Sequence, residues 1–419
     1  MAGATIDHIV ATTIFLAAML IFVSLFNQTI QTITLYQSQK NLAAKCSDLL
    51  DTMLLNPGYP IEADGDIPVE WGKRDYSPTI FGLQDPVPLQ SKLSPFSLSP
   101  FSLMRLKSSL GNPVYVDLNG TIKCYSNTTM DFGNYLLVSM EKVLKESDVA
   151  QLLGINGTYG FQLTLNPIIK VKINININGS YADIIVTGRD IPVPYAEVSY
   201  AVLGLTILGN YTAWDFDRAG ISNPGINVTD QNGQLRLPLS GTHESYLVLA
   251  YARVGGLTGF GCCKSPAGIN RFVVPLVESF EDRRVMLIRD CDLYDSSLSK
   301  SSEIYYNTTF VYINADFKIS ACKLSPEAFG KLEKSNPSVN LTLPSYTPGI
   351  LLVTYDCEGN RGFALMPWGI NAMAFPVVFG DDPSDEVWVA TEIRNVFVGG
   401  IAYEAKLSLW SIKGYEVIS

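Results

Sequence analysis

The sequence is poor in histidine and lacks short metal-binding or nucleotide-binding motifs. His8 and His243 are its two histidines, and His8 lies at the start of a long apolar segment. A Ser-His-Asp or Cys-His arrangement would therefore depend on His243, and one ring cannot build a histidine metal cluster. No C-x-x-C spacing and no G-x-x-x-x-G-K-S/T sequence occurs. We therefore expect no metal, no cofactor and no enzymatic activity.

Charged residues are also scarce, at 17%, and 30 Lys and Arg stand against 40 Asp and Glu. The net charge is −10 and no basic cluster occurs, which argues against a nucleic-acid partner. Hydrophobic residues make up 47% of the 419 residues, so the chain can build sizeable cores and is not intrinsically disordered.

The acidic residues form three short clusters, at residues 62–66, 290–295 and 381–386. None has the spacing of an EF-hand calcium loop, and we expect solvated loops there. Any two carboxylates that converge in the fold could hydrolyse a glycoside. A membrane-anchored hydrolase is therefore kept as a third alternative for the function.

Glycine and proline are absent from residues 4–56, and charge is absent from residues 9–26. An uninterrupted helix is expected up to Asn56-Pro57-Gly58, and its uncharged part would span about 27 Å, close to the hydrocarbon core of a bilayer. A cleaved secretion signal has a basic N-terminal region and a small-residue cleavage site, which this segment lacks. The pattern predicts a retained transmembrane helix followed by a stalk.

The predicted stalk has one apolar face. Leu35, Leu42, Cys46, Leu49 and Met53 follow one another at intervals of 7, 4, 3 and 4 residues, which places them on one side of a helix. Such a face needs a partner. Two alternatives stay open: the helix of another copy, or the globular part of the same chain.

Two features indicate that the part after the helix lies outside the cell. Nine N-x-S/T sequons occur where composition alone would give about three or four, which favours glycan acceptors in exposed turns. Six cysteines follow the helix and are expected to form disulfides, although the sequence does not say which cysteines pair. Cys46, which lies on the helix, is the unpaired seventh. Lys40 and Lys45 follow the apolar segment, and the positive-inside rule would place them in the cytoplasm. They lie, however, at the largest distance from the segment at which that rule still counts charges.

The residues behind these two predictions are as follows. Asn27 lies at the end of the apolar segment, and the predicted glycan acceptors are Asn119, Asn127, Asn156, Asn178, Asn210, Asn227, Asn307 and Asn340. The predicted disulfide cysteines are Cys124, Cys262, Cys263, Cys291, Cys322 and Cys357.

The segment "IDHIVATTIFLAAMLIFVSLFNQTI" (6–30), with one acid ahead of an apolar helix and a stalk, resembles the N-terminal part of archaeal type IV pilin-like proteins. The resemblance implies a short leader removed by a prepilin peptidase, and a cut after Ala2 would make Asp7 the fifth mature residue. It also implies that the helix packs among like helices, where the Asp7 carboxylate needs a partner charge such as a neighbour's α-amine. Alternatively, Asp7 and His8 mark the interfacial end of a plain anchor. The predicted assembly residues are Asp7, Ile9, Ile14, Phe15, Leu16, Leu20, Phe22, Leu25 and Phe26.

Beyond the helix the patterns predict mainly β structure. The expected fold class is α+β, mainly β, with a long membrane and stalk helix followed by antiparallel β-sandwich-type extracellular domains. Hairpins are expected at residues 112–126 and 161–188, each with an Asn-Gly turn, and residues 134–154 have helical spacing. The Ser-Pro steps of the tandem repeat "LSPFSLSPFSL" (93–103) disfavour a helix and predict a loop or an extended arm. The glycine-rich residues 255–261 are expected to be a loop.

Residues 191–256 resemble a transthyretin-like or carboxypeptidase-regulatory-like β-sandwich. The resemblance rests on "PVPYAEVSY", "TDQNGQLRLPL" (229–239) and "YLVLAYARV" (246–254), and it implies a module that packs, spaces or binds. The predicted domains are residues 1–57 (transmembrane and stalk helix), 58–188 (α+β domain), 189–256 (sandwich) and 257–419 (C-terminal β-rich domain).

The sequence therefore predicts an extracellular structural protein anchored in the cytoplasmic membrane. We expect a pilin-like or minor pilin-like subunit of a cell-surface filament such as an archaeal pilus. Its partners would be the membrane and like subunits or other pilin-like proteins, bound through the N-terminal helix. The alternative is a single-span surface adhesion or envelope protein that does not polymerise.

Overall fold

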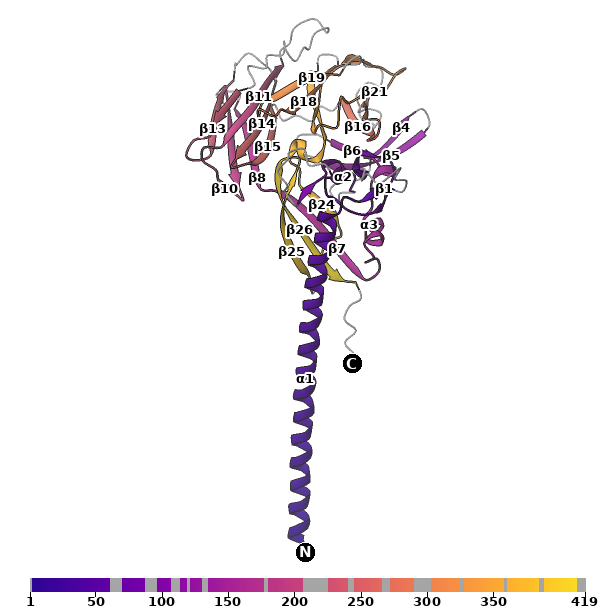
Figure 1. Cartoon of the computed structure of the whole chain (residues 1–419), viewed down its shortest axis with the longest axis vertical. Coiled ribbons are helices and arrows are strands. Elements are labelled where there is room, and N and C mark those ends of the chain that lie inside the picture. The colour runs from indigo at the N-terminus through magenta and orange to yellow at the C-terminus, as the bar shows by residue number, and fades with distance from the viewer. Residues whose placement is uncertain are drawn as a thin grey trace.

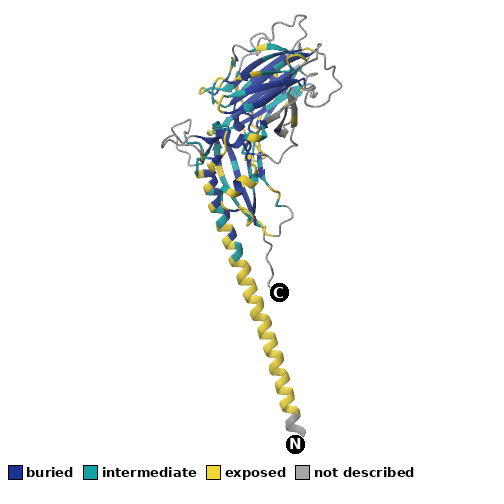
Figure 2. Cartoon of the chain, turned by 90° about the vertical axis from the view of Figure 1, so that its right-hand side faces the viewer, coloured by how far each residue is buried: buried dark blue, intermediate teal, exposed yellow. Residues whose placement is uncertain are grey.

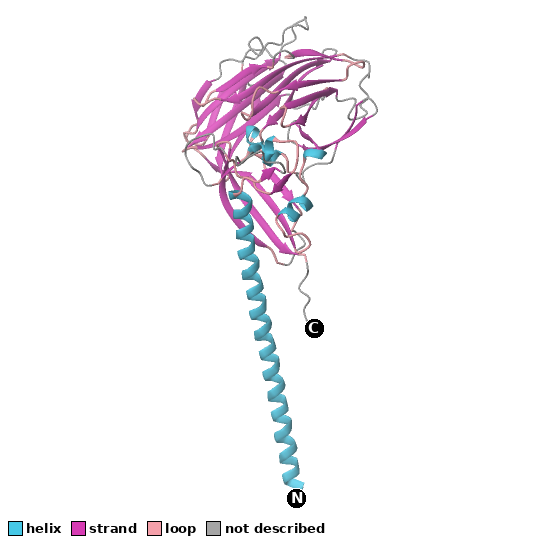
Figure 3. Cartoon of the chain, turned by 45° about the vertical axis from the view of Figure 1, so that its right-hand side comes forward, coloured by secondary structure: helices cyan, strands magenta, loops and turns pink. Residues whose placement is uncertain are grey.

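A computed structural model of the chain shows one long helix that carries a head built of β-sheets (Figure 1). Helix α1 spans Ala2–Leu55 and enters the head with its C-terminal part. The predicted fold class is confirmed, because strands dominate everything after α1 (Figure 3). The structure describes residues 2–60, 70–86, 96–106, 114–118, 121–129, 135–176, 180–205, 225–239, 245–265, 272–289, 303–324, 328–357, 360–383 and 388–412.

Helix α1 ends at the predicted Asn-Pro-Gly stop. Gly58 has a φ of +69°, a left-handed conformation that glycine adopts at no steric cost, and its N–H donates to Asn56 Oδ1 at 2.9 Å. The carbonyl of Met53 accepts from Leu83 N at 2.8 Å, and that of Asn56 accepts from Gln84 N at 3.0 Å. Two of the open carbonyls at the helix end are thus satisfied within the head.

A β-sandwich occupies one side of the head. Its apolar interior comes from the alternating faces of both sheets, as in Ile173 of β8 and Val248 of β14, which are both buried. One sheet contains β8 (Ile169–Asn176), β9 (Tyr181–Gly188), β10 (Ile191–Pro192) and β13 (Gln234–Pro238). The facing strands are β11 (Glu197–Leu205), β12 (Gly225–Val228), β14 (Ser245–Val254) and β15 (Leu257–Ser265).

Strands β8 and β9 form the predicted hairpin, with Asn176 opposite Tyr181. They lie before residue 189, yet their buried side chains belong to the sandwich core. The domain boundary at residues 188 and 189 stays a prediction, but the sandwich core begins at Ile169.

The glycine-rich residues 255–261 are not a loop, which corrects the expectation. Gly255 and Gly256, with φ of +54° and +88°, form a two-residue turn between β14 and β15. Gly259 and Gly261 lie in β15, where an added Cβ would meet the β8 backbone at 2.5 and 2.1 Å. The glycines therefore let two strands approach closely, a role that the sequence pattern did not distinguish from loop flexibility.

The sheet continues from the sandwich towards α1. Thr258 of β15 pairs in parallel with Ile401 of β26. The strands that follow are β26 (Ile401–Ser411), β25 (Ala390–Val398), β3 (Ser97–Leu98), β7 (Tyr159–Pro167) and β24 (Val377–Gly380). The last stretch of the chain thus provides the surface on which α1 lies.

Two further sheets complete the head. The first contains β4 (Val114–Leu118), β5 (Thr121–Thr129), β6 (Tyr135–Ser139), β16 (Val273–Ser279), β17 (Arg284–Arg289) and β21 (Ser338–Thr342). The second contains β18 (Ile304–Ile313), β19 (Ile319–Lys323), β20 (Phe329–Leu332), β22 (Gly349–Cys357) and β23 (Asn360–Trp368). β1 (Tyr59–Pro60) pairs with β2 (Pro78–Ile80) next to them.

Two local predictions in this region have different outcomes. The β4–β5 hairpin at residues 112–126 is confirmed, with Leu118 paired to Thr121. The helix expected over residues 134–154 is wrong in its first half, which forms β6. Among the described residues of this stretch, the only α-helix is α3 (Glu146–Leu152). Val138 of β6 pairs with Val277 of β16, so tertiary sheet pairing overrides the local helical pattern.

The tandem repeat at residues 93–103 was expected to be a loop or an extended arm, and its described residues 96–103 instead contain a short strand and most of a helix, which is a second correction. Its second copy forms α2 (Pro100–Met104), capped by the Ser99 hydroxyl, which accepts from Ser102 N at 3.0 Å. Pro100 occupies the first turn, where its missing N–H costs nothing. Phe101 is buried, and its ring centroid lies 5.1 Å from that of Trp368. The Ser-Pro step thus starts a buried helix.

Candidate anchoring and assembly helix

Helix α1 is exposed over most of its length. Every residue from position 6 to position 37 is exposed (Figure 2), and the segment is long and apolar enough to cross a membrane. Leu20 and Phe22 are 72% and 68% exposed. The predicted assembly residues all lie in this part and are all exposed, namely Asp7, Ile9, Ile14, Phe15, Leu16, Leu20, Phe22, Leu25 and Phe26.

The C-terminal part of α1 docks on the head of the same chain. Leu42, Cys46, Leu49 and Met53 are buried in the main core, against β25 and β26. This decides between the two alternatives for the stalk face, because the chain's own domain covers it. Leu35 is the exception and is 41% exposed. Each buried Leu or Met side chain contributes about 1.5–3 kcal/mol to docking.

Arg394 of β25 ties the docked helix to the sheet. Its Nε lies 3.2 Å from Asp51 Oδ1, and its Nη2 donates to Ser47 Oγ at 3.1 Å. The same guanidinium pairs with Glu392 beside it on β25. Asp51 and Ser47 are four residues apart, so both face Arg394 from one side of the helix. This contact fixes the rotation of α1 about its own axis.

Cys46 is expected to resist alkylation in the folded protein. Its thiol is 1% exposed and donates weakly to the carbonyls of Leu407 and Ala390. Burial, with a smaller effect from the nearby Glu392 carboxylate, raises its pKa to about 11, so about one thiol in a thousand is ionised at pH 8. Peptide mass spectrometry after iodoacetamide treatment measures this, with the half-exposed Cys322 as reference. Equal labelling of Cys46 and Cys322 would contradict the docked position of α1.

The exposed part of α1 is apolar all round up to Phe26, and one of its faces lies roughly opposite to the docked one. At 3.6 residues per turn, residues three and four apart share a face. Ile30 and Ile33 extend this face beyond the apolar segment, among polar Gln and Thr residues, and are 46% and 51% exposed. We call this face the apolar stripe; its residues are Phe15, Met19, Phe22, Phe26, Ile30 and Ile33.

Ile30 and Ile33 were not among the predicted assembly residues. Ile30 follows Phe26 by four residues and Ile33 follows Ile30 by three, a spacing that places all three on one side of a helix. Only the structure shows that the head packs on the face of Leu42 and Met53, so that the stripe lies roughly on the opposite side of the helix.

The segment after α1 is held on the head by a buried guanidinium. Arg105 is 0% exposed, and burial lowers its pKa to about 10. Its Nη1 donates to the carbonyls of Trp71 and Arg74 at 2.6 and 2.7 Å, its Nη2 to that of Tyr76 at 3.0 Å, and its Nε to that of Lys142 at 2.7 Å. Four carbonyls from two distant segments therefore share one cation.

Asp75 supplies the negative charge beside Arg105. Its carboxylate accepts from Ser279 Oγ at 2.6 Å and Phe280 N at 2.9 Å, and it lies 2.6 Å from Lys142 Nζ. Burial alone would raise the pKa of Asp75, but these hydrogen bonds outweigh it and hold the pKa below its ordinary value. The Arg105 and Asp75 contacts together connect residues 71–76 to the far end of β16.

The cysteines do not support the predicted disulfides in the described part of the head. Cys262 and Cys263 lie in β15, Cys322 in β19 and Cys357 in β22. No disulfide joins any two of the cysteines whose side chains the structure describes. Cys291 and the side chain of Cys124 lie outside the described residues, so their pairing stays a prediction.

The sequons lie on strands more often than in the expected turns. Asn227 on β12 and Asn340 on β21 are exposed, Asn307 on β18 is half-buried, and Asn156 lies in an exposed turn. Asn119, Asn178, Asn210 and the side chain of Asn127 lie outside the described residues. Glycan attachment stays a prediction at all eight positions.

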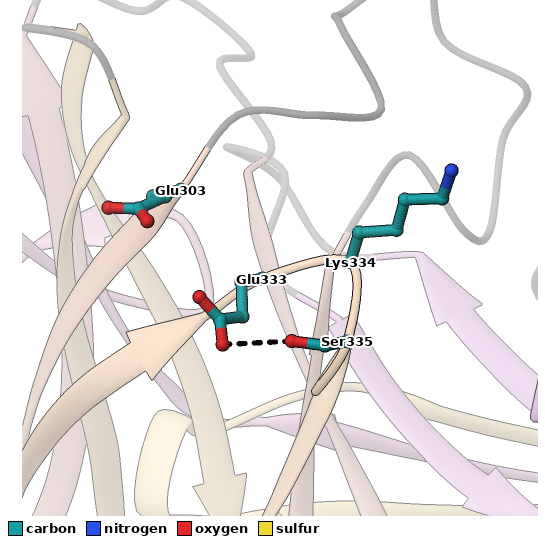
Figure 4. Close-up of a pocket in the computed structure, with 4 residues that line it drawn as sticks. All are labelled: Glu303, Glu333, Lys334 and Ser335. Carbon is teal, nitrogen blue, oxygen red and sulfur yellow. Dashed lines mark hydrogen bonds between the residues drawn. The ribbon is translucent and has the colours of Figure 1, made fainter.

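Two carboxylate pairs bear on the hydrolase alternative. Burial and a hydrogen bond with Asp381 raise the pKa of Glu146 to about 7, but two carboxyls in direct hydrogen bond leave no room between them for a glycosidic oxygen. Glu303 and Glu333 line an open trough of about 530 Å³ (Figure 4). Both pair with Lys331, at 2.8 and 2.9 Å, which lowers the pKa of each.

Neither pair therefore fits the acid and nucleophile of a glycosidase. His243 and the acidic residues 62–66 and 290–295 lie outside the described residues. Within the part of the chain that is described, no three His, Cys, Asp or Glu side chains come together as metal ligands would. The expected lack of enzymatic activity stays a prediction.

Comparisons with known proteins show no family for this chain. No protein-family model and no curated protein matches it. The D0-D1 domain of intimin covers 52% of this chain and 98% of its own, at 12% identity and a TM-score of 0.19. The match to a red sea bream transglutaminase spans 75% of this chain and 47% of the transglutaminase chain, at 11% identity and a TM-score of 0.19. The match to a chimeric titin Z1Z2 spans 50% of this chain and 96% of the titin chain, at 11% identity and a TM-score of 0.13. TM-scores this low carry no argument about function.

Proposed function

We propose that this chain is a membrane-anchored surface protein whose helix α1 also assembles with like helices, as a pilin-like or minor pilin-like filament subunit. The observation that carries the proposal is the apolar stripe, which continues past the membrane-length segment on the face that the head leaves free. Exposure of Ile30 and Ile33 to water is unfavourable in free energy, and a contact with another helix would bury their apolar surface.

The fixed attachment of α1 supports this proposal. Because Arg394 and the buried leucines hold the helix rigidly on β25 and β26, the apolar stripe has a defined direction relative to the head. Like helices that join through the stripe would therefore place their heads on the outside of the bundle. A structural filament needs such a repeated geometry.

A single-span surface protein that does not polymerise is the second candidate. The uncharged segment is apolar all round, so lipid alone would satisfy it without a protein partner. In that case Ile30 and Ile33 would lie just outside the bilayer and have no function. The two candidates therefore differ in what these residues contact.

Removal of the Asp7 carboxylate tests the proposal directly. We expect Asp7→Ala to reduce the protein in sheared filaments strongly, because the Asp7 charge would pair with a neighbouring subunit. Asp48→Ala, which removes an exposed carboxylate from the same helix, is the matched control and should leave assembly unchanged.

N-terminal sequencing of the mature protein accompanies this test. A pilin-like subunit should lose two residues and begin at Gly3. An intact Met1, with all the protein in the membrane fraction and none in sheared material, would favour the single-span alternative.

A further inference from the structure

An aromatic ring stands exposed on the outer face of the β18–β20 pair. Phe329 of β20 is 77% exposed, more than any other large hydrophobic side chain in the described residues, including those of α1. A phenylalanine on a strand of a folded head is normally covered on at least one side. No side chain in the described part of the molecule covers this ring, so another group can pack on it.

The residue directly opposite Phe329 is a sequon asparagine. The antiparallel register pairs Asn307 with Phe329 and Tyr305 with Lys331. Directly paired residues project from the same face, with Cβ atoms about 4.5–5.5 Å apart. Asn307 begins the sequence Asn307-Thr308-Thr309. An attached group on the Asn307 amide would therefore emerge next to the Phe329 ring.

The other sequons whose side chains the structure describes lack such a neighbour. Asn227 pairs with the buried Val198, and Asn340 pairs with the buried Met286. Asn156 lies in a turn and has no cross-strand partner. The combination of sequon and exposed aromatic ring therefore distinguishes Asn307 from these sites.

We propose that Asn307 carries an N-linked glycan whose first sugar packs on the ring of Phe329. The C–H face of a pyranose matches an aromatic ring in size and polarity, so the contact buries apolar surface of both. The proposal rests on the outward display of the head in the proposed function. It adds to that function a specific modification site and the residue that receives its sugar.

The attachment is a transfer between two named groups. The Asn307 amide nitrogen bonds to the anomeric carbon of a lipid-linked glycosyl phosphate, and the bond from that carbon to the phosphate oxygen breaks. The amide loses one proton, which leaves with the lipid phosphate, and no oxidation occurs. A host glycosyltransferase would catalyse this step.

The same face has room for the sugars that follow. Lys331 lies two residues from Phe329 along β20, and residues two apart share a face. Lys331 pairs with Glu303 and Glu333, which line the open trough together with Lys334 and Ser335 (Figure 4). The trough offers charged and hydroxyl groups that suit sugar hydroxyls. A glycan that starts on Phe329 can therefore run along the strand pair.

A thermal double-mutant cycle tests the contact on the full-length protein from the membranes of cells that display it. Glycopeptide mass spectrometry should find a glycan on Asn307. Phe329→Ala should then lower the melting temperature by about 1–3 °C, and the same change should have no effect in an Asn307→Gln background. Asn340→Gln is the matched control, in which Phe329→Ala should keep its full effect.

Two results would overturn the proposal. One is a bare Asn307 in protein that carries glycans at Asn227 or Asn340; the other is an equal Phe329→Ala shift with and without Asn307. Neither result would contradict the proposed function, because outward display and assembly do not need this glycan. Bare asparagine at every sequon would overturn the proposal as well.

Discussion

Replacing both Ile30 and Ile33 with glutamate is expected to abolish filament assembly while the protein stays in the membrane. Both residues lie on the apolar stripe, beyond the uncharged segment, so the substitution leaves the membrane anchor and the docked part of α1 intact. Two carboxylates buried at each helix contact would cost several kcal/mol, and about 1.4 kcal/mol is a tenfold change in an association constant. Electron microscopy and immunoblotting of sheared material measure the loss.

The helix offers a matched control for this substitution. Gln31 is exposed on the same turn but off the stripe, so Gln31→Glu adds charge at the same depth and should assemble normally. The head should melt at the same temperature in all variants, because α1 meets it only from Leu42 onward among the buried residues. Normal filaments from the double variant would exclude the stripe as the assembly surface.

Replacing Arg105 with methionine is expected to be the most destabilising single change in the head. Methionine fills part of the space but donates no hydrogen bond, so four buried carbonyls and the Asp75 carboxylate would lose their shared partner. Breaking a buried, hydrogen-bonded charge on one side costs about 3–5 kcal/mol. Chemical denaturation in detergent, followed by tryptophan fluorescence, measures the loss because Trp71 lies beside Arg105.

Arg236 provides the comparison. It forms a two-pronged ion pair with Asp183, at 2.7 and 3.0 Å, and stacks on Tyr181, but it is 64% exposed. Exposed ion pairs contribute little to stability, so Arg236→Met should lower the free energy of unfolding far less than Arg105→Met. Similar losses for the two variants would contradict the structural role assigned to Arg105.

The elements with strong local signals were predictable. Helix α1 and its end at Leu55 follow from the lack of glycine and proline before Asn56-Pro57-Gly58. The β4–β5 and β8–β9 hairpins follow from Asn-Gly turns and, in β8, from strict alternation. Each of these depends on residues that are close in sequence.

The elements that failed depend on distant partners. Residues 135–139 have helical spacing but form β6, because β5 and β16 supply sheet partners on either side. Ser99 and Pro100 read as loop residues until Trp368 and Tyr346, more than two hundred positions away, bury Phe101. Glycine is required at positions 259 and 261 because the β8 backbone lies too close for a side chain, and β8 is distant in sequence.

The long apolar helix, its stop and a head made mainly of strands could be predicted from the amino-acid pattern. These features follow from backbone freedom, hydrophobic period and turn chemistry within a few residues. The docking of Leu42 to Met53 on β25 and β26, the position of the apolar stripe opposite to the docked face, and the pairing of Phe329 with Asn307 became visible only in the folded chain. A face is buried or free only relative to what packs on it, and strand register brings together residues whose separation in sequence carries no signal.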